Sequence, residues 1–396
     1  MAAVLLSPFY LLLNYYLLRR MLLWFSTLNE FLGRVWFVAP FTLLFLLLVF
    51  SPLAAAFTKG RAKAVAQRIC NYWLGILMYL LIFLLLADLA ALIFRLFRHQ
   101  PVFSNPSRGV IRIGGGIVFL AVLSFSGYGI FHARHLKTVH YQISLSKKSP
   151  LPSLKIALAA DFHLGYNTGR NQMQRLVRKI NKMHPDLIVF AGDIFDNDFD
   201  AIPHPDRLIH AFQELKSTYG TYACWGNHDI SEVILAGFTF SSGKSPHTSD
   251  PRMNAFLKSS GIRLLEDETL LIDDAFYLAG RLDASCQEKS GIIRLTPTEL
   301  LSSLKKEKPV IIIDHQPSQL KELSEAGADL VLSGHTHDGQ LFPGNLTTRI
   351  GWENSRGLLT KGKMTSIVTS GAGVWGPAMR VGTCSEVVEI TVKFLP

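Results

Sequence analysis

Three long apolar stretches in the first third of this 396-residue chain restrict its fold more than any other feature. They cover residues 35–57, 69–94 and 113–131. A helix needs about 20 mainly apolar residues to cross the hydrocarbon core of a bilayer, and each stretch is about that long. The chain is therefore not a single soluble domain, and we expect three membrane-spanning helices in this region.

A fourth apolar stretch, residues 4–18, is shorter and contains Pro8 and Asn14. It either spans the bilayer or lies in the interface. We do not expect a cleaved signal peptide, because no charged segment precedes the stretch and more spans follow it. Residues 1–135 are therefore predicted to form an all-α transmembrane region with three or four helices, which makes the protein a multi-pass integral membrane protein.

Charge is divided unevenly along the chain. Residues 1–150 carry 15 Lys and Arg against two acidic residues, a net of +13, whereas the remainder has a net of −3. Basic residues beside apolar spans are typical of topology signals and of contacts with anionic lipids. We therefore expect the lipid bilayer as a partner and no nucleic acid. The sequence leaves open the oligomeric state and the side of the membrane that holds the second part.

A polar segment, residues 136–153, follows the apolar region and is predicted to be a tether. Beyond it, short apolar runs typical of strands alternate with longer polar stretches. Residues 170–183 have helical spacing, with one apolar face. Residues 154–396 are therefore predicted to form an α/β sandwich of mixed sheets covered by helices. The predicted strands are residues 154–160, 187–191, 221–225, 310–313, 330–332 and 367–369.

Residue types that bind metals follow five of these runs. The five motifs are Asp161-Phe162-His163, Gly192-Asp193-Ile194-Phe195-Asp196, Gly226-Asn227-His228-Asp229, Asp314-His315-Gln316-Pro317 and Gly334-His335-Thr336-His337. Each motif alone is weak evidence, because a buried histidine is more often a hydrogen-bonded core residue than a ligand. Five such strand ends in one chain, however, indicate a metal site at the edge of a sheet.

The ordered series DxH, GDxxD, GNHD, an isolated His and GHxH resembles the calcineurin-like metallophosphoesterase superfamily over residues 154–394. Residues 333–340 and 371–377 are similar to its membrane-anchored branch, in which amino-terminal transmembrane helices precede the phosphoesterase domain. The resemblance implies an αββα sandwich, with two mixed sheets flanked by helices. Asp338 departs from this branch, which commonly has glycine at that position, and we expect it to be a solvated turn residue.

The resemblance also implies a centre with two divalent metal ions. One ion would be held by Asp161, His163, Asp193 and His337, and the other by Asp193, Asn227, His315 and His335. Mixed oxygen and nitrogen ligands fit Mn, Fe or Zn better than Mg or Ca. Two such ions lower the pKa of a bridging water. The expected reaction is therefore attack by a metal hydroxide, without a covalent enzyme intermediate.

His228 and Asp229 are the expected catalytic side chains. By resemblance, His228 faces the substrate and either stabilises charge on the phosphoryl group or protonates the leaving oxygen. Asp229 would orient His228, and Asp196 would be a hydrogen-bond partner of the ligands. An ordinary loop carboxylate is the alternative for both aspartates. Trp375 and Arg380 are weaker candidates for lining a substrate pocket.

Three functions remain open. The first is hydrolysis of a phosphoester or pyrophosphate bond at the membrane, with lipid-linked substrates among the candidates. The second is a phosphodiesterase that acts on a soluble cyclic nucleotide. The third is a membrane scaffold that has lost catalysis; it is the least favoured, because every ligand position is filled and His228 is present.

Overall fold

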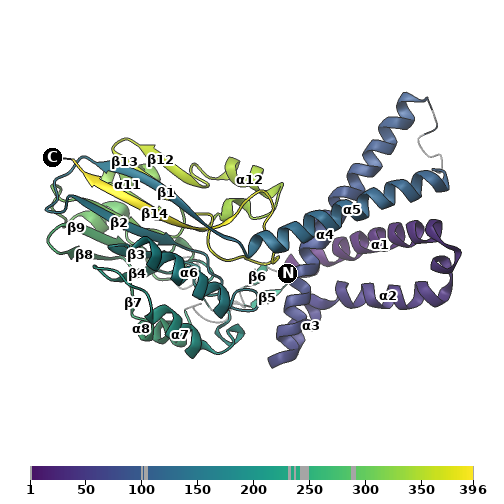
Figure 1. The fold of residues 1–396 in the computed structure, drawn as a ribbon, viewed down its shortest axis with the longest axis horizontal. Helices are drawn as coiled ribbons and strands as arrows, with labels where there is room; N and C mark the ends of the chain where they lie inside the picture. Colours follow the sequence, from purple (N-terminus) through teal and green to yellow (C-terminus); the bar gives the residue numbers. More distant parts are fainter. Residues whose placement is uncertain are drawn as a thin grey trace. The chain divides into compact units, whose positions relative to one another are not determined.

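A computed structural model of the chain describes residues 2–99, 101, 106–230, 233–235, 238–240, 249–286 and 291–395. The chain divides into two compact units, Met1–Gly129 and Ile130–Pro396. The first unit is helical, and the second contains two six-stranded sheets (Figure 1).

The helical unit contains fewer clear spans than the sequence predicts. Its helices are α1 (Ala2–Leu28), η1 (Glu30–Gly33), α2 (Val35–Val49), α3 (Ser51–Phe57), α4 (Gly60–Phe97) and α5 (Arg108–Ala133), the last of which continues into the second unit. Within the described residues, α4 and α5 are long and apolar enough to cross a bilayer. If the bent α2–α3 pair forms a single span, these residues contain three candidate spans; otherwise they contain two. The predicted segment 4–18 lies within α1.

The predicted span 35–57 is broken because α2 and α3 are bent by 52°. Pro52 occupies the first turn of α3, directly after the break at Phe50. Proline has no amide hydrogen to donate, and its ring clashes with the preceding turn of a continuous helix. Pro52 therefore prevents α2 and α3 from forming one continuous helix.

A charged group links α1 to α4. The Asp88 carboxylate of α4 lies 2.6 Å from the Arg20 guanidinium of α1 and accepts a 2.6 Å hydrogen bond from the Tyr16 hydroxyl. Ionisable residues inside an apolar helix are costly unless they are paired. The partner of Asp88 therefore comes from a different helix, and the pair fixes the register of α1 against α4.

The second unit is built on two mixed sheets. The first has the order β1 (Leu136–Leu145), β14 (Ser385–Phe394), β2 (Ser153–Ala159), β3 (Leu187–Ala191), β4 (Thr221–Cys224) and β7 (Ile262–Leu264). The second has the order β12 (Gly357–Lys361), β13 (Met364–Val368), β11 (Leu330–Ser333), β10 (Val310–Ile313), β9 (Phe276–Gly280) and β8 (Glu268–Ile272). The strands β2, β3, β4 and β7 run parallel, as do β9, β10, β11 and β13.

The alternation of side chains along each strand produces three hydrophobic layers. In β2, Ile156 and Leu158 pack between the sheets, whereas Ala157 and Ala159 face the helices that cover the first sheet. Those helices are α6 (Arg170–Met183), α7 (Pro205–Gln213) and α8 (Pro251–Ser259) (Figure 1). The second sheet is covered by α10 (Pro297–Leu301) and α11 (Leu320–Ala326). The predicted αββα sandwich is confirmed.

Shorter elements complete the second unit. They are the hairpin β5 (Val233–Leu235) and β6 (Phe238–Phe240), the 3-10 helices η2 (Phe199–Ala201) and η3 (His337–Gly339), and α12 (Gly344–Gly351).

The structure differs from the sequence analysis in the segment that was predicted to be a tether, residues 136–153. Leu136–Leu145 forms β1, which pairs in parallel with the whole of β14. Because β1 lies at the edge of its sheet, most of its side chains stay partly exposed, and the segment is too polar to be recognised as a strand.

Candidate metal centre

The carboxyl ends of five parallel strands carry all seven predicted metal ligands. Three of these strands, β2, β3 and β4, are neighbours in the first sheet, and β10 and β11 are neighbours in the second. Parallel strands place their carboxyl ends at the same edge, so the loops that follow them meet. The residues brought together there are Asp161, His163, Asp193, Asn227, His315, His335 and His337.

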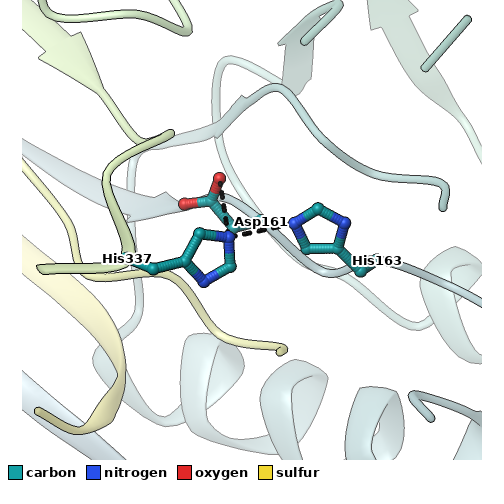
Figure 2. Close-up of side chains that lie close together, drawn as sticks. All are labelled: Asp161, His163 and His337. Carbon is teal, nitrogen blue, oxygen red and sulfur yellow. Dashed lines mark hydrogen bonds and ion pairs between the residues drawn. The ribbon is translucent and has the colours of Figure 1, made fainter. Parts of the chain in front are cut away.

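The first group of possible ligands consists of Asp161, His163 and His337 (Figure 2). The Nε2 atoms of His163 and His337 lie 3.0 Å apart, and Nε2 of His337 is 3.7 Å from the Asp161 carboxylate. All three residues are buried. Two imidazole nitrogens and a carboxylate that converge in this way fit a divalent transition metal ion.

The second group consists of Asp193, His315 and His335. Nε2 of His315 lies 3.2 Å from the Asp193 carboxylate, and the Asn227 side-chain oxygen is 2.8 Å from Nδ1 of His335. The same Asp193 oxygen is also 3.7 Å from Nε2 of His163. Asp193 therefore lies between the two groups of histidines.

The backbone around these ligands is unusual. Five of the seven have a positive φ angle, namely Asp161, His163, Asp193, His335 and His337. Non-glycine residues rarely adopt this conformation, and it is concentrated at functional sites. The Asp161-Phe162-His163 segment is thus not the extended strand end that the sequence pattern suggests. Both polar side chains reach the site because the chain turns there, while Phe162 enters the core.

A glycine loop closes around the first group. Gly371 has a φ angle of +83°, and a Cβ atom at this position would lie 2.7 Å from Cβ of Asp161. Any side chain at this position would displace the Asp161 carboxylate, which explains the glycine-rich segment after β13. The fully buried Arg380 holds this loop in place by donating to the carbonyl oxygens of Ser370 and Gly373 at 2.6 and 2.9 Å. Arg380 therefore supports the centre from behind and does not line a pocket.

The electrostatics of the site suit neutral imidazole ligands. Burial lowers the pKa of His335 to about 4 and lowers the pKa of His337 well below its usual value. These two rings are therefore uncharged at neutral pH, and the neutral imidazole is the form that binds a metal. Burial also raises the pKa of Asp161 to about 6, so a nearby cation would favour its ionised form.

The other two histidines lie in the field of the carboxylates. Burial opposes their charge, but the nearby carboxylates, Asp193 foremost, together outweigh it and raise the pKa of His315 well above its usual value. The pKa of His163 is also raised, against the effect of burial, by Asp196 and Asp193. The Asp196 carboxylate lies 3.5 Å from Nδ1 of His163, on the side of the ring away from Asp193. This negative environment attracts cations, either protons or metal ions.

His228 lies beside the first group, with its ring 5.0 Å from the ring of His163. Nδ1 of His228 contacts the Asn197 side-chain oxygen at 2.5 Å. The orientation of Asn197 is set because its amide nitrogen donates to the carbonyl of Ile230 at 2.8 Å. Asn197 therefore holds the His228 ring. The sequence analysis missed this residue, although it directly follows the GDxxD motif.

Asp229 does not orient His228. One oxygen of its carboxylate accepts from the backbone N–H of Phe195 and the other from that of Gly226, each at 2.7 Å. Both oxygens are thus used to connect the loop after β3 to the loop after β4. Asp229 therefore connects two loops that carry candidate ligands.

Asp338 is 1% exposed and is the middle residue of η3. Its carboxylate is 3.7 Å from Arg349 and 3.5 Å from Arg356. It is therefore a buried ion-pair residue and not the solvated turn residue that its position suggests. Trp375 packs its ring 5.9 Å from the ring of His228, beside the candidate centre.

Comparisons with known proteins define the class. Residues 154–339 match the family model described as Calcineurin-like phosphoesterase. An uncharacterized metallophosphoesterase of Aquifex aeolicus is 30% identical over 279 residues, which cover 70% of this chain and 98% of that protein. The chain therefore belongs to the calcineurin-like phosphoesterase family, whose members are metal-dependent.

Two further relatives are similar to the chain over more than half of its length. A "Transmembrane protein with metallophosphoesterase domain" of Danio rerio is 29% identical over 70% of this chain and 62% of that protein. This chain thus spans less than two thirds of the length of the zebrafish relative. The UDP-2,3-diacylglucosamine pyrophosphatase LpxG of Chlamydia trachomatis is 25% identical over 63% of this chain and 86% of that protein.

Proposed function

We propose that the protein hydrolyses a phosphoester or pyrophosphate bond of a lipid-linked substrate with two divalent transition-metal ions, Mn, Fe or Zn. The observation that carries this proposal is the position of Asp193, whose single oxygen lies within 3.7 Å of His163 and 3.2 Å of His315. A carboxylate between two groups of nitrogen ligands is suited to bridge two cations.

The candidate ligands form two sets, one for each proposed ion. The first would be held by Asp161, His163, Asp193 and His337, and the second by Asp193, Asn227, His315 and His335. When bound, a pair of such ions supplies Lewis acidity and lowers the pKa of water between them. The neutral amide of Asn227 adds an oxygen donor without adding negative charge.

His228 is proposed as the catalytic acid–base residue. Because Nδ1–H donates to the Asn197 oxygen, Nε2 is the nitrogen left for the substrate. Burial lowers the pKa of His228, so the ring is neutral at physiological pH and Nε2 can take up a proton and return it to a leaving oxygen. Asp229 acts indirectly, by holding the two ligand loops together.

The membrane assignment rests on the helical unit. We propose that the protein is a multi-pass membrane protein, with α4 and α5 as spans and the α2–α3 pair as a third. A lipid-linked substrate is consistent with this location. It is also consistent with LpxG, a relative whose name describes a pyrophosphatase acting on a diacylated sugar nucleotide.

The test compares two substrates on the full-length protein in detergent with added Mn²⁺. We expect cleavage of the pyrophosphate bond of UDP-2,3-diacylglucosamine, and loss of at least about a hundredfold in kcat when His228 is replaced by alanine. Turnover of 3′,5′-cyclic AMP without cleavage of the lipid-linked compound would favour the soluble-nucleotide phosphodiesterase instead. No turnover of any phosphoester by metal-loaded protein would contradict the enzyme assignment.

A further inference from the structure

The short helix α12 (Gly344–Gly351) buries a polar residue and exposes apolar ones, which is the reverse of a helix on a surface that faces water. Its inward-facing Asn345 is only 8% exposed, whereas Leu346 and Ile350 are 49% and 87% exposed. These two apolar residues are four positions apart and therefore share one face of the helix. Phe342, just before the helix, is also 44% exposed. A surface helix normally buries its apolar residues and exposes its polar ones.

The helix α12 adjoins the candidate metal centre. A Cβ atom on Gly339 would collide with the backbone of Asn345, so η3, which carries His337, packs directly on the first turn of α12. At the other end, Trp352 follows the helix and places its ring 5.1 Å from the ring of His335. The exposed apolar face thus belongs to a helix that contacts ligand-bearing elements at both ends.

Two arginines lie next to this face, and the exposed Glu353 beyond the helix is paired with Lys361. The side chain of Arg349, which belongs to the same helix, is 58% exposed, and that of Arg356 is 30% exposed. Their acidic partners are Asp338, shared by both arginines, and Glu386, which pairs with Arg356; both carboxylates are only 1% exposed. The carboxylates are therefore shielded, while the Arg349 guanidinium is presented to the outside.

We propose that α12 docks onto an anionic lipid surface, with Leu346 and Ile350 among the acyl chains and Arg349 at the level of the headgroups. Exposed apolar residues accompanied by a cation are typical of helices that lie in a membrane interface. A bilayer is available to every copy of a chain that spans it with α4 and α5. This docking would bring lipid-linked phosphates to the metal centre, so the inference rests on the proposed function and adds how its substrate is recruited.

The test uses two chromogenic diesters that differ only in their alkyl chain. Hexadecyl p-nitrophenyl phosphate partitions into the bilayer, whereas methyl p-nitrophenyl phosphate stays in water. The full-length protein is reconstituted in nanodiscs that contain phosphatidylglycerol, and Leu346 and Ile350 are both replaced by serine. The matched control replaces Leu271 and Ile293 by serine as well. These residues are 45% and 80% exposed and lie in other parts of the same unit. We expect kcat/KM for the hexadecyl ester to fall by about tenfold in the α12 variant only.

Turnover of the methyl ester separates the possible outcomes. The proposal requires that this turnover is unchanged in the α12 variant. An equal loss on both esters would show a structural role for α12, and no loss on either ester would show no role in recruitment; each result overturns the proposal. Failure of the unaltered protein to cleave either ester would count against the proposed function instead.

A second measurement tests docking without any turnover. A nitroxide is attached at Ile350→Cys, and in a separate sample at Ile293→Cys, in full-length protein whose four native cysteines are buried. In nanodiscs, we expect the label at position 350 to collide more with oxygen, which partitions into lipid, than with a water-soluble nickel complex, and the label at position 293 to show the reverse. Equal accessibility at the two positions, or spin–spin coupling between two copies of the chain at position 350, would overturn docking onto lipid.

Discussion

At the scale of single residues, the most informative contact is the one between Asn197 and His228. Metal-site and catalytic histidines depend on a partner at the second ring nitrogen, which fixes the tautomer and the ring orientation. Here the Asn197 oxygen occupies that position, and its own amide nitrogen is fixed by the carbonyl of Ile230. Without this acceptor the His228 ring can rotate, and the proton of the neutral ring is no longer held at Nδ1.

We therefore predict that Asn197→Ala lowers kcat by about tenfold to a hundredfold with little change in metal content. The measurement is steady-state turnover of methyl p-nitrophenyl phosphate together with elemental analysis of the purified protein. Asn181→Ala is the matched control, because Asn181 also donates to a backbone carbonyl but on the exposed surface of α6. Loss of metal in parallel with loss of turnover would contradict a role through His228.

Residue types alone identify the seven candidate ligands that the structure brings together, but not the residues that support them. Asp193 and His335 could be recognised because each stands in a short motif at a predicted strand end. Asn197 could not, because its partner His228 is distant in sequence and is brought close only by the packing of two loops. The role of Asp229 was misjudged for the same reason, since its partners Phe195 and Gly226 are backbone amides.

At the scale of elements, β1 is a strand that the hydrophobic pattern of the sequence does not predict. The strands β3 and β10 are buried on both faces, and their continuous apolar runs identify them with the correct bounds. The strand β1 is at the edge of its sheet, and its polar residues alternate with few buried ones. Its pairing partner β14 is far away in the sequence, so no pattern near β1 predicts that the two strands pair.

The structure predicts that a catalytic fragment starting at Ile130 is more stable than one starting at Ser153. The shorter fragment loses β1, exposes the edge of β14 and removes Leu136, Ile143 and Leu145, each at most 7% exposed. At about 1.5 kcal/mol or more for each buried side chain, the free energy of unfolding falls by at least about 4 kcal/mol. Urea unfolding of both fragments measures the difference, and equal stabilities would show that β1 is a dispensable tether.

At the scale of the whole molecule, the buried carboxylates of the candidate metal site give this part of the second unit a negative charge that attracts cations. In the metal-free protein, the carboxylates raise the pKa values of His163 and His315 above the ordinary histidine value. Their ion pairs stabilise the fold at low pH, and this contribution is lost as the pH rises through the raised pKa values. Metal ions bind the same nitrogens and must displace these protons.

Metal affinity is therefore predicted to weaken as the pH falls, because protonated His163 and His315 compete with the metal. His335 and His337 add no competition near neutral pH, since their pKa values are lowered. Calorimetric titration of chelator-treated protein with Mn²⁺ between about pH 6 and pH 8 measures the effect, together with proton release in buffers of different ionisation enthalpy. An affinity that does not change over this range would contradict protonated ligands in the metal-free site.

The fold and the candidate metal site of the second unit lead to one structural expectation, that Asp193 joins two metal ions. The most direct measurement is the metal content of purified full-length protein beside Asp193→Asn, with the exposed Asp206→Asn of α7 as control. We predict about two transition-metal ions per chain in the unaltered protein and the control. The Asp193→Asn protein should hold no more than about one and should not turn over methyl p-nitrophenyl phosphate. Two ions retained without Asp193, or a single ion in the unaltered protein, would contradict the bridged centre.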